Sequence, residues 1–445
     1  MNLVQGFSST TPPVNTAIGA VSEPVRQSDE RMVIGVLVVA SCYQGVLCLM
    51  NTKFMGASVA LIGLAEALIM LACGPILLRR VLPGVIILAA LIGAVLCICA
   101  MFIGHINIKA FRDLFVPLCF FWFGCNVGRT DLADRVLKYI IAVVLGMGLF
   151  ELFFLDTYTQ YFDIFSYYVS TGNLQPITEY VRDSKLQLNG IRPEGIGRTL
   201  FPALLGSHRI SSVFLEPVSL GNFATMLAAW GLSKNNTEIR QMLFFLIIAL
   251  VLMVLSDSRF ALTLVPLMVI MRMMLSGSAW VLAALSPFVA VGLVIVVGMA
   301  IPDHVGDNIS GRLAMSGWAL LEFDLPMLFG AASSAPFFGD QGYAYLLSRF
   351  GLPLTLILWF SIWLLPMPDE HGLRFRAFAS VYIALILSVS GTSLFAFKSA
   401  GVLWFLMGCL LKIPAPENPL NKPLMERLAS RFQNNSEVIR RKDAH

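Results

Sequence analysis

Apolar residues recur along this chain in runs of about twenty, the length at which a helix crosses the hydrocarbon core of a bilayer. Short polar turns separate most of these runs, and longer polar segments separate a few of them. Twelve runs can be drawn, at 32–50, 54–78, 82–104, 110–127, 136–155, 212–232, 241–255, 260–275, 280–301, 342–365, 378–397 and 401–411. The pattern predicts an all-α polytopic membrane protein with about twelve transmembrane helices.

The polar segments divide the chain into parts. In order they are a flexible tail rich in Ser, Thr and Pro, the first five spans, a large loop, four spans, a second large loop, three spans and a basic tail: 1–31, 32–156, 157–211, 212–301, 302–341, 342–411 and 412–445. The N-terminal segment is too long and too mixed in charge to begin a cleavable signal. The first span is therefore expected to direct insertion.

Lys and Arg are distributed unevenly between the two sides of the expected bundle. The side that holds the N-terminus also collects the basic turns: Arg79, Arg80, Arg129, Arg135, Lys138, Lys234, Arg240, Arg272, Arg374 and Arg376. Because cytoplasmic loops carry an excess of Lys and Arg, both termini are expected in the cytoplasm and both large loops on the outer face. This bias accounts for the net charge of +4 without a nucleic-acid partner.

The composition excludes an ordinary soluble enzyme. Hydrophobic residues make up 57% of the chain and mean hydropathy is +0.77. Charged residues make up 13%, against about 25% in a soluble domain. The eight cysteines lie in or beside apolar runs, so we expect neither a disulfide framework nor a zinc site. Because the chain has no Walker A loop, metal-ligand triad or Gly-x-Ser-x-Gly nucleophile, no cofactor is expected.

Arginines in the first large loop run against the topological bias, which favours a role in ligand binding. Arg192 and Arg198 flank glycines that let a backbone approach a ligand closely. The planar guanidinium matches phosphate oxygens, so a diphosphate is the natural hypothesis. The alternative is a loop whose charges are solvated or contact lipid headgroups.

Glu216 falls at the start of the sixth run, close to the expected membrane boundary. An ionisable residue there is a functional hypothesis, with Arg209 as a natural partner. Alternatively, Glu216 and Pro217 begin a helix, since Glu favours the positive end of the helix dipole and Pro the first turn. His208 could act as a base at neutral pH or serve as a surface donor. Glu66 could belong to a proton path or be hydrogen-bonded between helices.

Several short motifs follow one another in an order that resembles one known family. They are Ser211-Ser212-Val213-Phe214-Leu215-Glu216-Pro217 with Gly221, Ser258-Arg259-Phe260, Gly311-Arg312 with Trp318 and Gly330, residues 340–345, and Arg349-Phe350-Gly351-Leu352. In this order and spacing the chain resembles the O-antigen polymerase and ligase superfamily, polytopic bacterial enzymes of lipid-linked polysaccharide assembly. The resemblance covers roughly residues 200–360 and the plan of spans with two large periplasmic loops.

The resemblance implies a membrane-embedded glycosyltransferase that uses no metal or other cofactor. Such an enzyme acts on polyprenyl-diphosphate-linked sugars at the periplasmic face of the bacterial inner membrane. Its loop arginines bind the diphosphate and the sugar chain. The expected binding residues here are Arg209, Arg259 and Arg312, with Arg192, Arg198 and Asp340 in addition.

The chemistry of an activated lipid diphosphate sets two requirements. The departing diphosphate needs charge neutralisation, which arginines supply without a metal. The attacking hydroxyl needs a base, for which Glu216 is the first choice, followed by Asp257 and His208. Tyrosines of the first loop are suited to stacking on sugar rings: Tyr158, Tyr161, Tyr167, Tyr168 and Tyr180.

These expectations favour a polymerase of exopolysaccharide or O-antigen, which transfers the growing chain onto the next lipid-linked repeat unit. A ligase is the nearest alternative, but the ligase-type histidine has no clear counterpart because His304 precedes Arg312. A flippase or transporter would show charges within the spans and pseudo-symmetric halves, whereas the charges here gather in two unequal loops. A lipid scaffold without activity would tolerate loss of the matching arginines. Expected partners are the bilayer, the lipid-linked oligosaccharide, a chain-length regulator and a flippase.

Overall fold

The structure is a computed structural model that describes residues 27–172, 186, 199, 201–206, 208–301, 309–332, 338–339 and 341–411. These residues belong to one compact unit, Arg26–Lys412. Every regular element in the described ranges is a helix, so the predicted all-α class is confirmed for that part of the chain.

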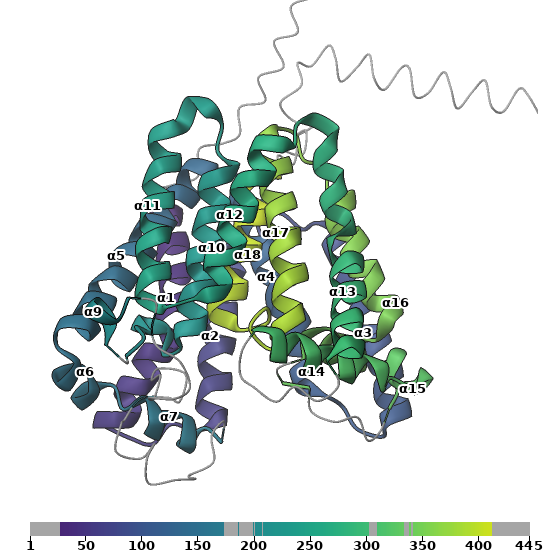
Figure 1. Cartoon of the computed structure of the whole chain (residues 1–445), viewed down its shortest axis with the longest axis horizontal. Helices are drawn as coiled ribbons and strands as arrows, with labels where there is room; N and C mark the ends of the chain where they lie inside the picture. The colour runs from purple at the N-terminus through teal and green to yellow at the C-terminus, as the bar shows by residue number, and fades with distance from the viewer. Residues whose placement is uncertain are drawn as a thin grey trace, which may run out of the picture. The chain divides into compact units, whose positions relative to one another are not determined.

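Long helices run side by side, and short helices lie at their ends (Figure 1). The long helices are α1 (Gln27–Lys53), α2 (Val59–Leu77), α3 (Pro83–Ile103), α4 (Ile108–Val127), α5 (Thr130–Phe153), α10 (Pro217–Ser233), α11 (Ile239–Ser256), α12 (Arg259–Met274), α13 (Ser286–Ala300), α16 (Gly342–Leu364), α17 (Glu370–Val389) and α18 (Phe397–Cys409). The others are α6 (Leu155–Tyr161), α7 (Ile164–Ser170), α9 (Pro202–Leu205), α14 (Ile309–Leu321), α15 (Leu325–Leu328) and the 3-10 helices η2 (Ser212–Phe214), η3 (Asn236–Glu238) and η4 (Gly277–Leu285).

Within the described ranges, nine helices are long and apolar enough to cross a membrane. They are α1 to α5, α11 with η3, α13 with η4, α16 and α17. Large apolar side chains face outward from them, with Leu71 72% exposed, Met101 83% and Leu364 82%. Apolar exposure on this scale is unfavourable in water and favourable in lipid. The protein is therefore an all-α, multi-pass membrane protein.

Four of the short helices, α6, α7, α14 and α15, gather at one end of the bundle. α6 and α7 follow α5, and α14 and α15 precede α16, yet all four lie at the same end (Figure 1). We call this the loop end. Both large polar segments therefore contribute to the same end, as the alternation of the spans predicts. The two segments contain these helices, whereas the sequence pattern indicated only loops.

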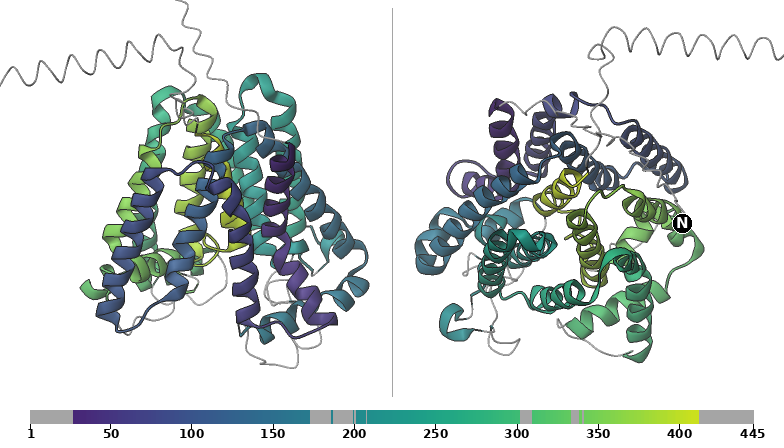
Figure 2. Two further views of the ribbon diagram at one scale, coloured as in Figure 1. Left: turned by 180° about the vertical axis from the view of Figure 1, so that it is seen from behind. Right: turned by 90° about the horizontal axis from the view of Figure 1, so that it is seen from above.

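α17 and α18 lie inside a ring formed by the other helices (Figure 2). α18 packs closely on α4 because glycines face each other at the crossing. A Cβ on Gly124 would meet the Phe405 carbonyl oxygen at 2.2 Å, and one on Gly408 would meet the Phe121 carbonyl oxygen at 2.2 Å. Small residues allow such close backbone contact between helices in a membrane. This close contact with α4 fixes the position of α18 in the bundle.

Each of the twelve predicted runs overlaps a helix. The helix of the eleventh run, α17, begins earlier than the apolar pattern indicated, at Glu370. Arg374 and Arg376 were expected to lie between spans, yet both belong to α17, whose N-terminus is capped by Asp369. The Arg376 guanidinium donates to the carbonyl oxygens of Trp363 and Leu365 and lies 4.6 Å from the Trp363 ring. A cation is accommodated there because it satisfies carbonyl groups at the end of α16.

The sixth and tenth runs are interrupted helices. α10 begins only at Pro217, with Glu216 in the N-cap position, so these two residues do begin a helix as one interpretation proposed. The residues before Glu216 form an irregular buried segment. α16 is broken at Gly351, whose φ of 72° lies in the left-handed region that glycine adopts without strain.

Candidate functional site

A buried carboxylate at the end of α5 holds the segment that leads into α10. Glu151 accepts hydrogen bonds from the backbone nitrogens of Ser211 and Ser212, at 3.0 and 2.6 Å, and from the Ser211 hydroxyl at 3.0 Å. The Tyr158 hydroxyl donates to the Ser212 carbonyl oxygen at 3.0 Å. A carboxylate that accepts hydrogen bonds from backbone N–H groups is a strong anchor in a buried site. The position of this segment is therefore fixed from both sides.

The same segment has an unusual backbone. Ser212 and Leu215 have φ values of 54° and 60°, a region that side-chain-bearing residues adopt at a free-energy cost. Burial of both residues and the Glu151 contacts hold them there. The left-handed backbone at these two residues turns the chain. Arg209 therefore lies against the α11–α12 turn, and Glu216 begins α10.

Arg209 ties this segment to the α11–α12 turn. Its Nε donates to the Ser256 carbonyl oxygen at 3.1 Å, and its Nη2 donates to the Asp257 carbonyl oxygen at 3.4 Å. Nε also lies 3.9 Å from Oδ2 of Asp257. Asp257 takes a left-handed conformation with a φ of 47°, which ends α11 and reverses the chain. The expected pairing of Arg209 with Glu216 is therefore wrong, because Arg209 lies against Asp257 and Glu216 has other partners.

Gly221 lets α10 approach the same turn. A Cβ on Gly221 would lie 2.3 Å from the Ser258 Oγ, which is closer than real Cβ contacts allow. Ser258 in turn caps α12 by accepting from the Ala261 nitrogen at 3.3 Å. This contact fixes Arg259 as the first residue of α12.

Arg312 reaches the site from α14. Two glycines, Gly298 of α13 and Gly317 of α14, face each other so closely that a Cβ on either would meet backbone atoms of the other at 2.8 Å. The Trp318 indole nitrogen also donates to the Gly298 carbonyl oxygen at 2.9 Å. These contacts hold α14 against α13. Arg312 lies about one and a half helical turns before Gly317 on α14.

Four of the residues singled out in the sequence line one cavity of about 900 Å³. Arg209, Asp257, Arg259 and Arg312 come from the α9–α10 segment, the α11–α12 turn and α14. Most of the other lining residues are apolar and belong to α12, η4, α13 and α17: Leu267, Met271, Leu282, Val289, Leu293 and Leu385. Among the described residues of the lining, three guanidiniums lie with one carboxylate. The cavity can therefore hold an anion beside a long apolar chain.

Glu216 and His208 do not line this cavity. Glu216 accepts from the Ser219 hydroxyl at 2.8 Å and from the Tyr168 hydroxyl at 2.9 Å, and lies 3.3 Å from the Lys398 ammonium. Burial disfavours its charge, but Lys398 and the two hydroxyls hold the pKa of Glu216 below its ordinary value. His208 Nε2 lies 3.1 Å from Glu151 Oε1 without hydrogen-bond alignment.

Accessible surface distinguishes the three expected bases. The Glu216 side chain is 30% exposed, whereas those of Asp257 and His208 are nearly closed off. An attacking hydroxyl must come within hydrogen-bond distance of its base. Of the three, Glu216 offers the most surface for that contact.

The tyrosines of the first loop were expected to stack on sugar rings, and for three of them this is wrong. Tyr158 of α6 and Tyr167 and Tyr168 of α7 are buried, and Tyr158 and Tyr168 donate their hydroxyls to the protein. Burial raises the pKa of Tyr168 well above its ordinary value, so its phenol stays protonated and donates to Glu216. Tyr161 remains exposed and carries the Lys53 ammonium 4.8 Å from its ring centre.

Other expected residues lie outside the described ranges: Arg192, Arg198, Asp340, His304 and Tyr180. Among the residues that the structure describes, no group of three or more His, Cys, Asp or Glu side chains could hold a metal ion.

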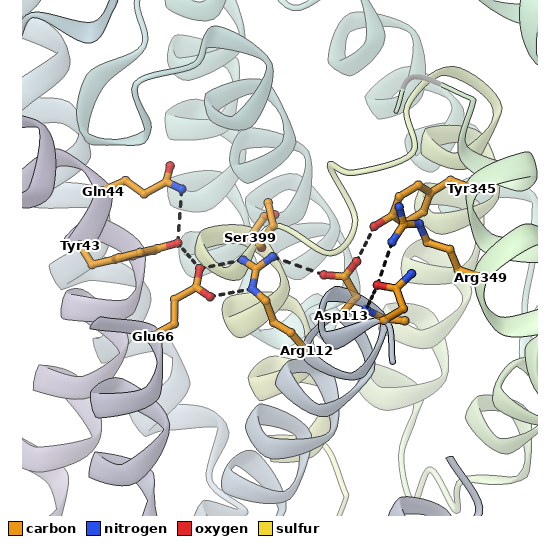
Figure 3. A network of polar contacts seen from close by, with 11 residues as sticks. Tyr43, Gln44, Glu66, Arg112, Asp113, Tyr345, Arg349 and Ser399 are labelled. Atoms are coloured by element: carbon orange, nitrogen blue, oxygen red, sulfur yellow. Dashed lines mark hydrogen bonds and ion pairs between the residues drawn. The ribbon is translucent and has the colours of Figure 1, made fainter. Parts of the chain in front are cut away.

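The sequence did not single out Lys398 or Glu151 as site residues. Lys398 is buried at the start of α18 and donates to Gln44 Oε1 at 2.8 Å and to the Phe214 carbonyl oxygen at 2.6 Å. It links Glu216 to α1, where the Tyr43 hydroxyl donates to Glu66 at 2.6 Å (Figure 3). Glu66 is thus a buried carboxylate hydrogen-bonded between helices, which was one of its two interpretations.

Comparison of the chain with protein families, with curated proteins and with solved structures finds no match.

Proposed function

We propose that the protein is a polymerase of bacterial surface polysaccharide, an exopolysaccharide or O-antigen. It transfers the growing glycan from one polyprenyl diphosphate to the next lipid-linked repeat unit. The proposal includes twelve spans in the inner membrane, with α10, α12 and α18 as the three shorter ones, and a loop end that faces the periplasm. The observation that carries it is the cavity in which Arg209, Arg259 and Arg312 lie beside apolar walls.

The chemistry of that cavity suits a lipid diphosphate better than a soluble substrate. Guanidinium groups pair with diphosphate oxygens through two parallel hydrogen bonds, and the apolar walls accept a prenyl tail. Arg259 and Arg312 retain exposed surface, and Arg209 is buried behind them. On this proposal Arg259 and Arg312 contact the diphosphate, while Asp257 holds Arg209 in position at 3.9 Å.

The reaction breaks the bond between the anomeric carbon of the growing chain and the diphosphate oxygen. The bonding electron pair leaves with the polyprenyl diphosphate, whose added charge the arginines stabilise. A hydroxyl of the acceptor sugar bonds to the anomeric carbon and gives its proton to a base. Glu216 is the proposed base because it is ionised at neutral pH and the most exposed of the three candidates.

The experiment uses purified protein in nanodiscs with a lipid-diphosphate-linked repeat unit and no added metal or nucleotide. A ladder of longer lipid-linked glycans is expected, and Arg259→Ala and Arg312→Ala should each lower its rate by roughly a hundredfold or more. Arg240→Ala, at the exposed start of α11 on the opposite end, is the matched control and should retain the wild-type rate.

Two other outcomes would replace the proposal. Transfer of the glycan to added lipid A without a ladder would mean a ligase. Movement of the lipid-linked sugar between leaflets, without either product, would mean a flippase or transporter.

A further inference from the structure

A second polar cluster joins α2, α4 and α16 at the loop end (Figure 3). Arg112 donates from two nitrogens to the Glu66 carboxylate, at 2.6 and 2.7 Å, and Asp113 accepts from the Tyr345 hydroxyl at 2.6 Å. Arg112 Nη1 also lies 3.4 Å from Asp113 Oδ1. These bonds form a largely buried polar cluster, in which the Arg112 guanidinium contacts the carboxylates of Glu66 and Asp113.

Two further cations, Lys109 and Arg349, lie beside this cluster, and we call them the rim cations. The Arg349 guanidinium lies 4.5 Å from the Tyr345 ring centre, and the Lys109 ammonium lies 5.7 Å from it. Lys109 is exposed and Arg349 half-buried. Among the described residues of the cluster, Arg112 and the rim cations make three cations beside the carboxylates of Glu66 and Asp113.

A second cavity, of about 500 Å³, adjoins this cluster. Its lining is almost entirely apolar and includes Leu114, which follows Asp113 on α4, and Leu346 on α16. Phe395 also lines it and packs its ring 5.9 Å from that of Tyr345. The cavity thus begins beside the ring that carries the rim cations.

The two cavities lie on opposite faces of one wall. From α13, Val289 and Leu293 line the first cavity, while Phe288 and Val291 line the second. α17 is divided in the same way: Leu385 lines the first and Ile383 and Leu387 line the second. Cations line the first cavity, whereas the rim cations lie beside the second cavity, on the ring that packs against its lining residue Phe395.

We propose that the second cavity is a second lipid-diphosphate site, with the prenyl tail in the cavity and the diphosphate at Lys109 and Arg349. The inference rests on the proposed polymerase, which must hold two lipid-linked glycans at the same time. The first cavity then holds the donor, and the second holds the acceptor. The diphosphate is favoured over a phospholipid because two cations lie together on the Tyr345 ring beside an apolar cavity, which suits a highly charged head with an apolar tail.

Native mass spectrometry of the detergent-solubilised protein with a long-chain polyprenyl diphosphate tests the stoichiometry. The wild type should bind two lipids. Lys109→Ala/Arg349→Ala should bind one, as should Arg259→Ala/Arg312→Ala, and the fourfold variant should bind none. Lys138→Ala/Arg240→Ala removes two exposed cations at the opposite end and should still bind two.

The rim cations have a second readout in the polymerase assay. Lys109→Ala/Arg349→Ala should raise the acceptor KM by roughly tenfold or more with little change in donor affinity, and Lys109→Ala with Arg349→Lys should recover part of that loss. Thermal unfolding of each variant verifies that it is folded.

Two lipids bound to Lys109→Ala/Arg349→Ala would overturn the second site, as would full displacement of the second lipid by phosphatidylglycerol at equal concentration. A wild type that binds two lipids but makes no ladder would instead overturn the polymerase and leave the second site standing.

Discussion

Glu151 Oε2 lies 2.6 Å from the backbone nitrogen of Ser212, which follows it by 61 residues in the chain. Through this bond the end of α5 determines where Arg209 faces the first cavity. The carboxylate is wholly buried. Arg209 lines the cavity, and the carboxylate that holds its segment in place comes from a helix far away in the sequence.

Removing this carboxylate should unfold the segment locally. Glu151→Ala leaves the Ser211 and Ser212 amides buried without an acceptor, which should lower the free energy of unfolding by about 3 kcal/mol or more. Glu151→Gln retains one acceptor and should lose less. Thermal unfolding in detergent measures both, with the exposed Glu322→Ala as the control. A Glu151→Ala midpoint equal to that of Glu322→Ala would contradict the anchoring role.

The contact between Gly221 and Ser258 predicts a suppressor pair. Gly221→Ala places a Cβ 2.3 Å from the Ser258 Oγ, which should displace Arg259 and lower the polymerase rate by roughly tenfold or more. Ser258→Gly removes the atoms that clash, although it also removes the side-chain cap of α12, at a cost of roughly a few tenths of a kcal/mol. The double variant should therefore be more active than Gly221→Ala alone. Equal activity of the two would show that the close contact does not position Arg259.

Glu216 predicts a pH-dependent stability. Its folded pKa is lowered, so the carboxylate contributes stability that is present above its ordinary pKa of about 4.3 and is lost as the pH falls through the folded value. At neutral pH, Glu216→Gln should unfold at a lower temperature than the wild type because Lys398 then lacks a counter-charge. The gap between their midpoints should close below about pH 4. A gap of constant size over that range would refute the linkage.

Arg312→Lys distinguishes a fork-shaped contact from a point charge. Lys keeps the charge but cannot bind diphosphate oxygens through two parallel bonds, so the polymerase rate should fall by roughly tenfold, between those of the wild type and Arg312→Ala. Steady-state kinetics with varied donor measure the change. A wild-type rate for Arg312→Lys would mean that charge alone suffices.

Apolar periodicity predicted the helices well because each span requires its own run of apolar residues. Their boundaries were harder to predict where a charge sits inside a helix. Arg376 resembles a loop residue in the sequence, yet it lies in α17 because it satisfies carbonyl oxygens of α16. The start of α10 at Pro217 could be predicted from the sequence, since Pro in the first turn is a local signal of a helix start.

The site was partly recoverable from motif order. Arg209, Arg259 and Arg312 were singled out, and they do line one cavity. The partners of Glu216 were not found, because Lys398 follows it by 182 residues and has no local signature beyond one cation before an apolar run. Arg192, Arg198 and Asp340 lie outside the described ranges, so their role stays a prediction.

The wall of α13 and α17 bears on how a polymer would grow. If donor and acceptor tails occupy its two faces, each transfer leaves the lengthened glycan on the acceptor lipid, on the far side of the helices from the donor cavity. The tail cannot pass through packed helices, so it must return to the bilayer before serving as the next donor. Elongation would then be distributive, with every added unit followed by release, and the distribution of chain lengths would follow from competition among lipids in the membrane.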